Sequence, residues 1–453
     1  MTIVEEWAKN IKETRYENID PRVIEGAKLR VMDVIGCTIG GVNGDGCSMI
    51  LDLIKEWGGS PESTILVHGI KVPSHYAAMV NSIMARSYDF EPSGPASIDG
   101  RQALSHISAT MVPVAFALAE TAGSNGKELL TALILGEDVA SRLVAASVPQ
   151  LEPWDPIGTV NKFGAAATTG KLLGLSEQQQ INAFGIVINQ AAGSFQTIID
   201  KSHSFKLYQG LASQDGIFSA KLAQKGWTGL IDPLFSKCGY FALYCKSSQP
   251  DILNKELGTF GLDGPHKVYP GCGRTLAAVN CAWDLIQKHD LNADDISEVI
   301  VNVTAENHTS PVGQEFHIGG SAQASALFSI QYGVATALVR KDLRLEHYVE
   351  ECIRDESIMD FIKKIRLEDV IPPEMDLGAE LKVIMKDGTE YFSAPPKRLF
   401  STMSEIKDKF MTNVEFSKTV SSENAKAALD MLENLEDIDD ISQIIELLVA
   451  GKS

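Results

Sequence analysis

The spacing of apolar residues changes once along this chain of 453 residues, and the change constrains the fold more than any other feature. Up to about residue 265 apolar residues recur mostly at steps of three and four, as in residues 128–146, which is typical of helices with one buried face. After about residue 290 the step shortens to two, and in residues 299–303 valines alternate with an isoleucine and an asparagine. We therefore expect a helical part followed by a part that contains strands.

The strand-like pattern is confined to one stretch of the chain. Residues 381–385 and 389–392 are two apolar runs around Asp387-Gly388, a pair that favours a tight hairpin turn. From Met403 onward the helical spacing returns. The predicted fold is mostly α: a large all-helical bundle domain formed by residues 1–265 and 401–453, with a smaller α+β domain of residues 266–400 inserted into it.

Local signals support helices in the first part. Ser176 with Gln179 fits a capping box that opens a helix, and Gly226 is placed to end the helix that precedes it. Small residues are dense in the segment 164–167, where they let helices approach closely. These features indicate a compact bundle.

Composition excludes several classes of function. A formal net charge of −19 offers no basic face for nucleic acid. The 7 cysteines include no Cys-x-x-Cys pair, so we expect reduced thiols and no zinc or iron–sulfur site. There is no signal-like start and no uncharged apolar stretch of membrane-spanning length, which predicts a cytoplasmic protein without a membrane partner. Nucleotide-binding glycine motifs, His-Glu-x-x-His and Gly-x-Ser-x-Gly are absent too, so a cofactor-independent site is favoured.

Polar residues that could carry chemistry fall at five places. The polar loop between two apolar helical segments is the strongest, because it combines carboxylates with an imidazole that titrates near neutral pH. Removing a proton beside a carboxylate needs a base, an acid and donors for the developing anion, and the five places could supply all three. They are Asp89 with Glu91 and His106; Asp155; His203 with Lys206 and Tyr208; Lys267 with Tyr269, Cys272 and Arg274; and Tyr332.

Each candidate also has a structural alternative. Asp89, His106 and Asp155 are residue types that cap helices or form turns. Lys206 and Lys267 could be solvated surface charges. Cys272 could simply pack, and Tyr332 could be a core residue whose hydroxyl has a local partner. Residue type alone leaves both interpretations open.

Several short blocks, taken in order, resemble one family. They include Asp33 in residues 31–37, the acidic motif Asp89-Phe90-Glu91, and His106 ahead of Val-Pro-Val-Ala-Phe-Ala-Leu-Ala-Glu. Gly-Leu-Ala at 210–212, Lys-Val-Tyr-Pro at 267–270 and Phe-Ser-Ile-Gln-Tyr at 328–332 follow. The chain resembles the MmgE/PrpD family over nearly its whole length.

That resemblance implies a lid-like smaller domain, a homodimer, and lyase or isomerase chemistry on small polycarboxylates without metal or organic cofactor. By position, it implies that Asp89, His106, Lys267 and Tyr332 are the catalytic residues. Asp89 and His106 are expected to form the acid/base pair and Tyr332 to donate to the developing anion. Lys267, with Lys206 or Arg274, is expected to hold a substrate carboxylate. Further substrate contacts are expected from Tyr208, Asp155, Cys272 and Glu91.

The chain departs from the family where relatives carry histidines. Asp155 stands in place of the histidine of a His-Pro block, Tyr208 in place of a second histidine, and Leu276 in place of a third. Losing imidazoles and gaining a carboxylate changes the charge available for a substrate. A dehydratase-type lyase is the leading hypothesis. An epimerase or decarboxylase, and a non-catalytic metabolite-binding homologue, are the alternatives.

Overall fold

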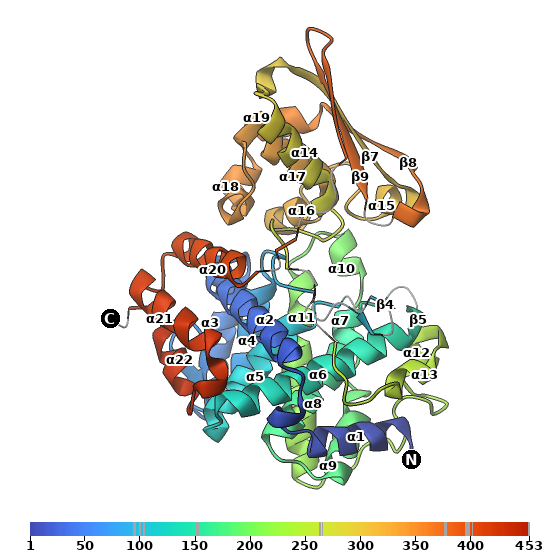
Figure 1. Ribbon diagram of the computed structural model, residues 1–453, viewed down its shortest axis with the longest axis vertical. Coiled ribbons are helices and arrows are strands. Elements are labelled where there is room, and N and C mark those ends of the chain that lie inside the picture. The colour runs from blue at the N-terminus through green and yellow to red at the C-terminus, as the bar shows by residue number, and fades with distance from the viewer. Residues whose placement is uncertain are drawn as a thin grey trace.

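The computed structural model describes residues 1–93, 97–98, 101–102, 105–150, 154–261, 264, 266–375, 378–394, 399–400 and 402–451. The fold is mostly helical with a small mixed sheet, as the apolar spacing predicts. Figure 1 shows two bodies, one above the other, and the chain leaves the larger body once and returns to it. The larger body comprises described residues up to 261 and from 402 onward, and the smaller body those from 269 to 393.

Helices make up most of the larger body (Figure 1). They are α1 (Ile3–Glu13), α2 (Pro21–Gly40), α3 (Cys47–Trp57), α4 (Ser74–Arg86), α5 (Ser108–Ala122), α6 (Gly126–Ala146), α7 (Pro156–Thr159), α8 (Asn161–Leu172), α9 (Glu177–Val187), α10 (Gln196–Ile199), α11 (Ser204–Gln224), α12 (Tyr240–Tyr244), α13 (Pro250–Asn254), α20 (Met403–Ser417), α21 (Ser422–Glu433) and α22 (Ser442–Leu447).

The local signals for helices are confirmed. The side chains and backbones of Ser176 and Gln179 bond reciprocally as a capping box at the start of α9. Gly226 has φ +95° two residues after the end of α11. Both residues therefore stop or start a helix where the sequence predicts it.

The expectation that this body is all-helical is wrong in detail, because short strand pairs join its helices. An antiparallel pair β1 (Ser63–Ile65) and β2 (Ile70–Val72) turns through Val67 and Gly69, both at φ 68°. Such three-residue runs are too short to show an alternating pattern in the sequence. The other pairs are β3 (Ser97–Ile98) with β4 (Arg101–Gln102) and β5 (Ser147–Gln150) with β6 (Cys245–Ser248).

The smaller body contains the predicted sheet. Its strands lie in the order β10-β9-β7-β8, with β7 and β8 parallel and the other neighbours antiparallel. Residues 299–303 lie in β7, which confirms the predicted strand, although Ile300 is buried together with the three valines; Gly388 at φ +87° turns the predicted hairpin. The strands are β7 (Ile296–Thr304), β8 (Ile365–Ile371), β9 (Ala379–Met385) and β10 (Glu390–Ser393), and the helices are α14 (Leu276–Lys288), α15 (Ala305–Thr309), α16 (Ala322–Leu327), α17 (Ile330–Arg340), α18 (Glu350–Ile353) and α19 (Glu356–Ile362).

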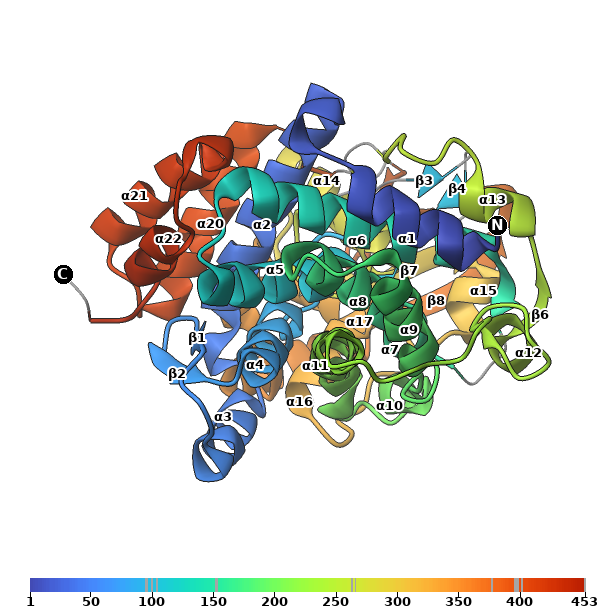
Figure 2. The ribbon, with the colours of Figure 1, turned by 90° about the horizontal axis from the view of Figure 1, so that it is seen from below.

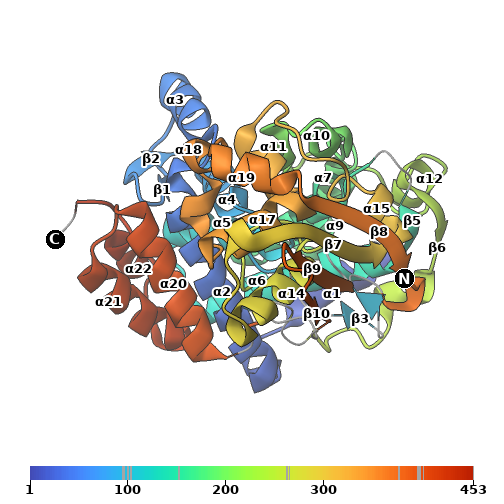
Figure 3. The same cartoon turned by 90° about the horizontal axis from the view of Figure 1, so that it is seen from above.

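Each body has its own hydrophobic core. One cluster of buried residues runs from Val4 to Phe260 and resumes from Ile406, and the other lies mainly between Tyr269 and Val383. From above, the smaller body lies across the helices of the larger one (Figure 3). The two connections run side by side, since His266 and Phe400 form an isolated β-bridge. Two cores agree with two domains, while the limits at residues 266 and 400 stay a prediction.

The returning C-terminal helices pack against the start of the chain. Figure 2 shows α20 beside α2, with α21 and α22 outside them. Gly36 makes this approach possible, because a Cβ there would lie 3.1 Å from Phe410 Cα. No single helix in the described residues is long and apolar enough to cross a membrane; the segments Pro21–Asn43 and Cys47–Trp57 meet that criterion only together, bent by 89°.

Candidate active site

A cavity of about 960 Å³ lies where the two bodies meet. The larger body contributes the loop after α4, the segment before α5, and α7 and α10. The smaller body contributes residues 272–274, α15 with the segment after it, and Phe328. A pocket between two bodies is a common setting for small-molecule sites.

The acidic motif is buried beside two cations at this cavity. Asp89 and Glu91 are 1% and 0% exposed. Arg86 Nη1 lies 2.5 Å from Asp89 Oδ1 and 3.0 Å from Glu91 Oε1. Lys267 Nζ donates to the same Asp89 oxygen, to the Asp89 carbonyl at 2.6 Å and to the Gly271 carbonyl at 3.2 Å. The two carboxylates and the two cations therefore neutralise one another.

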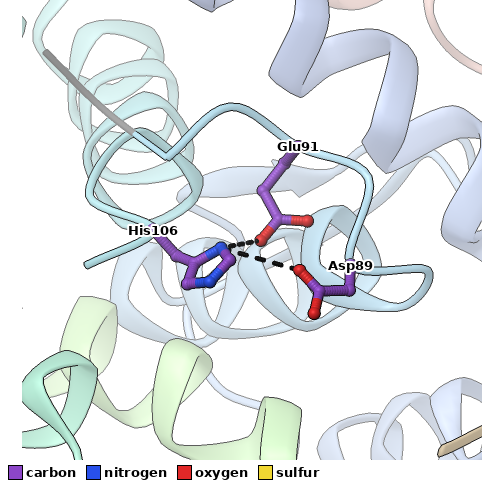
Figure 4. A group of neighbouring side chains, drawn as sticks. All are labelled: Asp89, Glu91 and His106. Atoms are coloured by element: carbon purple, nitrogen blue, oxygen red, sulfur yellow. Dashed lines mark hydrogen bonds and ion pairs between the residues drawn. The ribbon is translucent and has the colours of Figure 1, made fainter. Parts of the chain in front are cut away.

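His106 completes the cluster with Asp89 and Glu91 (Figure 4), and it is one of the residues that line the cavity. Its Nδ1 lies 2.7 Å from Glu91 Oε1 and 3.8 Å from Asp89 Oδ1. The backbone that carries the ring is fixed as well, because Gln209 Nε2 donates to the His106 carbonyl at 2.9 Å. Asp89 and His106 both have left-handed backbones, at φ 47° and 49°. Two non-glycine residues in this sparsely populated region at one site indicate a conformation imposed by the surroundings.

Burial and charge act in opposite directions on the two carboxyls. Burial alone would raise the pKa of each, but the Arg86 guanidinium beside both, and the Lys267 ammonium beside Asp89, hold their pKa values below the ordinary range. Both are therefore ionised at neutral pH. Because an ionised Glu91 can only accept, Nδ1 of His106 carries the hydrogen of that bond, and in the neutral ring Nε2 is left with a free lone pair. In that tautomer Nε2 is the ring atom that can accept a proton.

The same three side chains are spaced closely enough to be metal ligands. The ligand atoms of Asp89, Glu91 and His106 lie within 4.8 Å of one another. Arg86 and Lys267, however, already pair with these two carboxylates, so a metal ion would add further positive charge beside two buried cations. The donor set thus fits an ion-pair network better than a metal ion.

A second buried charge cluster supports the acidic motif from behind. Asp33 of α2 lies 2.7 Å from Lys409 Nζ of α20 and 2.7 Å from His266 Nδ1. Lys409 also donates to the carbonyl of Phe90 at 2.7 Å, between the two acidic residues. The contact between α2 and α20 thereby fixes the backbone that presents the carboxylates.

Comparison with known proteins agrees with this architecture. The model of the MmgE/PrpD N-terminal domain matches residues 5–253, and that of the MmgE/PrpD C-terminal domain matches residues 269–437. The chain belongs to the MmgE/PrpD family. Cis-aconitate decarboxylase from Homo sapiens is 26% identical over 461 residues, which cover 95% of this chain and 91% of that protein. The Mus musculus enzyme of the same name is 23% identical, covering 95% and 90%, and the Aspergillus terreus enzyme is 22% identical, covering 79% and 76%.

Three of the four residues implied by the MmgE/PrpD resemblance meet at the cavity. Asp89, His106 and Lys267 lie in one contact network. The ammonium of Lys267 has three hydrogens and three protein acceptors, so it acts on the site chiefly by holding Asp89. Its expected direct contact with a substrate carboxylate is therefore not supported.

Three of the expected substrate contacts also line the cavity: Asp155, Cys272 and Arg274. Arg274 donates to Glu306 at 2.6 Å and to Asn307 at 2.8 Å, and its side chain is 35% exposed. Among the described cations of the cavity wall, Arg274 is the one whose side chain is most exposed. Burial raises the pKa of the Cys272 thiol, which keeps it protonated at neutral pH.

Three others lie behind the wall. Glu91 and Tyr208 each contact a residue that lines the cavity. Glu91 Oε1 bonds to His106 Nδ1, and the Tyr208 hydroxyl donates to Asp155 Oδ2 at 3.2 Å. Lys206 is buried with its Nζ 3.2 Å from Ser87 Oγ, and it is not among the described residues of the cavity wall. It points into the packing between helices instead of toward a ligand.

Tyr332 is separated from the other catalytic candidates. It is completely buried in the core of the smaller body, packs between the rings of Phe316 and Tyr348, and donates to the carbonyl of His347. It is absent from the described cavity wall. The alternative of a core residue with a local hydroxyl partner fits this position.

Arg86 is the functional residue that the sequence analysis missed. It lies at the end of α4, three residues before Asp89, with a 2% exposed side chain. An arginine in an apolar helical segment just before an acidic motif was the available signal, because such a charge is seldom buried without an anionic partner.

Proposed function

We propose that the protein is a lyase acting on a small carboxylic acid, and that His106 removes a proton from the carbon next to a carboxylate. The observation that carries this proposal is the bond of His106 Nδ1 to the buried Glu91, which leaves Nε2 as the basic atom of a ring that lines the cavity. A base held in one tautomer by a carboxylate, with a cavity before it, is the arrangement that general base catalysis needs.

The remaining charges fit the later steps. Once protonated, His106 can return the proton to a leaving hydroxyl group, so that water departs from the same face. Arg86 and Lys267 stabilise the negative charge that develops on the substrate through the field of the cluster. Arg274 is suited to hold the substrate carboxylate at the cavity mouth, because its planar fork matches a carboxylate. Asp89 serves as the anion that keeps the two buried cations in place.

Decarboxylation is the second candidate, and the names of the relatives favour it. In that reaction carbon dioxide leaves and His106, entering as imidazolium, protonates the carbanion. Epimerisation needs a second proton donor on the opposite face, and Asp155 is the carboxyl that lines the cavity without an ion pair among the described residues. A protein that only binds a metabolite remains the non-catalytic alternative.

A screen by proton NMR in heavy water separates these reactions. Hydroxy and unsaturated mono-, di- and tricarboxylates are incubated with the protein. Loss of water with a new vinyl signal indicates dehydration, and loss of carbon dioxide indicates decarboxylation. Exchange of a C–H for deuterium without net loss indicates epimerisation. Ligand line broadening without any of these changes would contradict the proposed lyase.

We further propose that residues 266–400 act as a lid over a domain of residues 1–265 and 401–453, in a cytoplasmic homodimer that needs no metal or organic cofactor. The cavity wall drawn from both bodies supports the lid. The exposed Met49, Leu53 and Trp57 along α3, spaced by four residues, support a subunit contact. Light scattering tests the homodimer, because it gives the mass of the assembly in solution. Activity that persists after dialysis against a chelator tests whether the protein works without a metal.

A further inference from the structure

The cavity wall carries balanced charge. Among the residues that the structure describes, three cations and three carboxylates line it, and the buried Glu91 behind it adds a further negative charge. A polyanionic ligand would find no excess of positive charge among these described residues. The cations are Arg86, Lys267 and Arg274, and the carboxylates are Asp89, Asp155 and Glu306.

Five of these six charges already have partners. Arg86 and Lys267 pair with Asp89, and Arg274 pairs with Glu306. Asp155 differs. Within the described residues its carboxylate accepts from the Ile157 amide at 2.8 Å and the Tyr208 hydroxyl at 3.2 Å, with no ion pair to a lysine, arginine or histidine.

The carboxylate of Asp155 is also almost inaccessible to bulk water, at 4% exposure, although it lines the cavity. Burial is the largest influence on its pKa and raises it, against smaller opposing effects from the Ile157 amide, Arg86 and His106. A carboxylate has about four acceptor positions, so two remain after the two bonds from protein donors. Those positions can receive a donor from a ligand.

Helix capping accounts for only part of this residue. Asp155 is the N-cap of α7, and one of its oxygens serves that role. Serine, threonine or asparagine would cap the helix equally well without a charge. The negative charge and the bond from Tyr208 therefore need a separate explanation.

We propose that Asp155, positioned by Tyr208, selects a carboxylic acid that carries one carboxylate and a hydroxyl or ammonium group, and discriminates against di- and tricarboxylates. This inference rests on the proposed function for the identity of the site. Asp155 accepts the hydrogen bond of the hydroxyl or ammonium group, while Arg274 faces the single carboxylate. A second carboxylate would lie near an anion that forms no ion pair with a lysine, arginine or histidine among the described residues.

Ligand-observed NMR titration of a charge series tests this specificity. The probes are propanoate, 2-hydroxypropanoate, 2-aminopropanoate, butanedioate and propane-1,2,3-tricarboxylate. We expect wild type to bind the hydroxy or the amino acid at least about 10-fold more tightly than the tricarboxylate, since a hydrogen bond to a charged group is worth roughly 10- to 100-fold in affinity. Which of the two binds better tells a hydroxyl from an ammonium.

Two variants isolate the charge. Asp155→Asn keeps a cap acceptor and removes the charge, and we expect it to lose the preference. Tyr208→Phe keeps the charge and the cap but removes the bond that positions the carboxylate, and we expect it to weaken the preference without abolishing it. Tighter or equal binding of the tricarboxylate by wild type, an unchanged ranking in Asp155→Asn, or binding of none of the probes would overturn the inference.

Deuterium exchange in the same samples separates the two proposals. If the ranking holds and no probe exchanges a C–H or is converted, the lyase function fails while the selectivity of Asp155 stands. Exchange in the tricarboxylate at a rate equal to that of the hydroxy acid would leave the lyase function intact and overturn the selectivity.

Discussion

Replacing Glu91 by glutamine tests how the structure activates His106. Glu91 Oε1 receives both bonds of this side chain, from His106 Nδ1 at 2.7 Å and from Arg86 Nη1 at 3.0 Å, while Oε2 has no partner in the described residues. Since both neighbours are donors, the amide oxygen of Glu91→Gln takes the place of Oε1 and the amide nitrogen that of Oε2. The variant therefore removes the charge and keeps the hydrogen bonds.

The size of the effect follows from that geometry. At 2.7 Å, the Coulomb attraction between Glu91 and a protonated ring is about 6 kcal/mol with an effective dielectric constant of 20. Desolvation of the buried carboxylate offsets much of it, so the net loss is nearer the roughly 1.5–3 kcal/mol typical of a hydrogen bond to a charged group. We expect turnover to fall by about 10- to 100-fold.

Two assays read out this variant. Steady-state kinetics with the substrate found in the screen give the rate, and ¹⁵N NMR of labelled imidazoles gives the tautomer of His106. We expect a slower enzyme in which Nδ1 still carries the hydrogen. Glu91→Leu, which removes the acceptor as well, is expected to be slower still. Full activity of Glu91→Gln, or a hydrogen found on Nε2 of the neutral ring, would refute the reasoning.

Two further substitutions test the surroundings of the site. Tyr332→Phe removes only the hydroxyl bonded to the carbonyl of His347, so we expect activity near wild type and a loss of about 1 kcal/mol in the free energy of unfolding; a loss of activity in folded protein would return Tyr332 to the site. Lys267→Met removes one of the two cations that pair with Asp89, and we expect the free energy of unfolding, measured in denaturant at neutral pH, to fall by about 3–5 kcal/mol. Folding lowers the pKa of Asp89, so the stability that its carboxylate adds is present above the ordinary carboxyl pKa near 4 and is lost as pH falls through the pKa in the folded protein. The difference in the free energy of unfolding between wild type and Lys267→Met should therefore narrow below about pH 4. A difference that does not depend on pH would contradict this account.

Periodicity predicted the secondary structure where one face of an element is buried. The alternation in residues 299–303 and the Asp387-Gly388 turn correspond to β7 and to the β9–β10 hairpin. The segment 128–146 lies within α6. Short pairs such as β1–β2 were missed because three residues do not establish a period.

The sequence identified the residues of the site better than their partners. Asp89, His106 and Lys267 lie together as expected. No local sequence pattern, however, indicates that the Lys267 ammonium donates three hydrogen bonds to protein acceptors. Arg86 escaped notice because its function depends on burial beside two carboxylates. Tyr332 and Lys206 are not among the described residues of the cavity wall, and resemblance in sequence order carries no information on which way a side chain points.

The most direct test of the central claim is the rate at which deuterium from heavy water enters the carbon next to the substrate carboxylate. If His106 is the base, His106→Ala should exchange at least about 100-fold more slowly than wild type while remaining folded. The same substitution at His317, an exposed histidine outside the described cavity wall, should leave the rate unchanged. Exchange by His106→Ala at the rate of wild type would contradict the account.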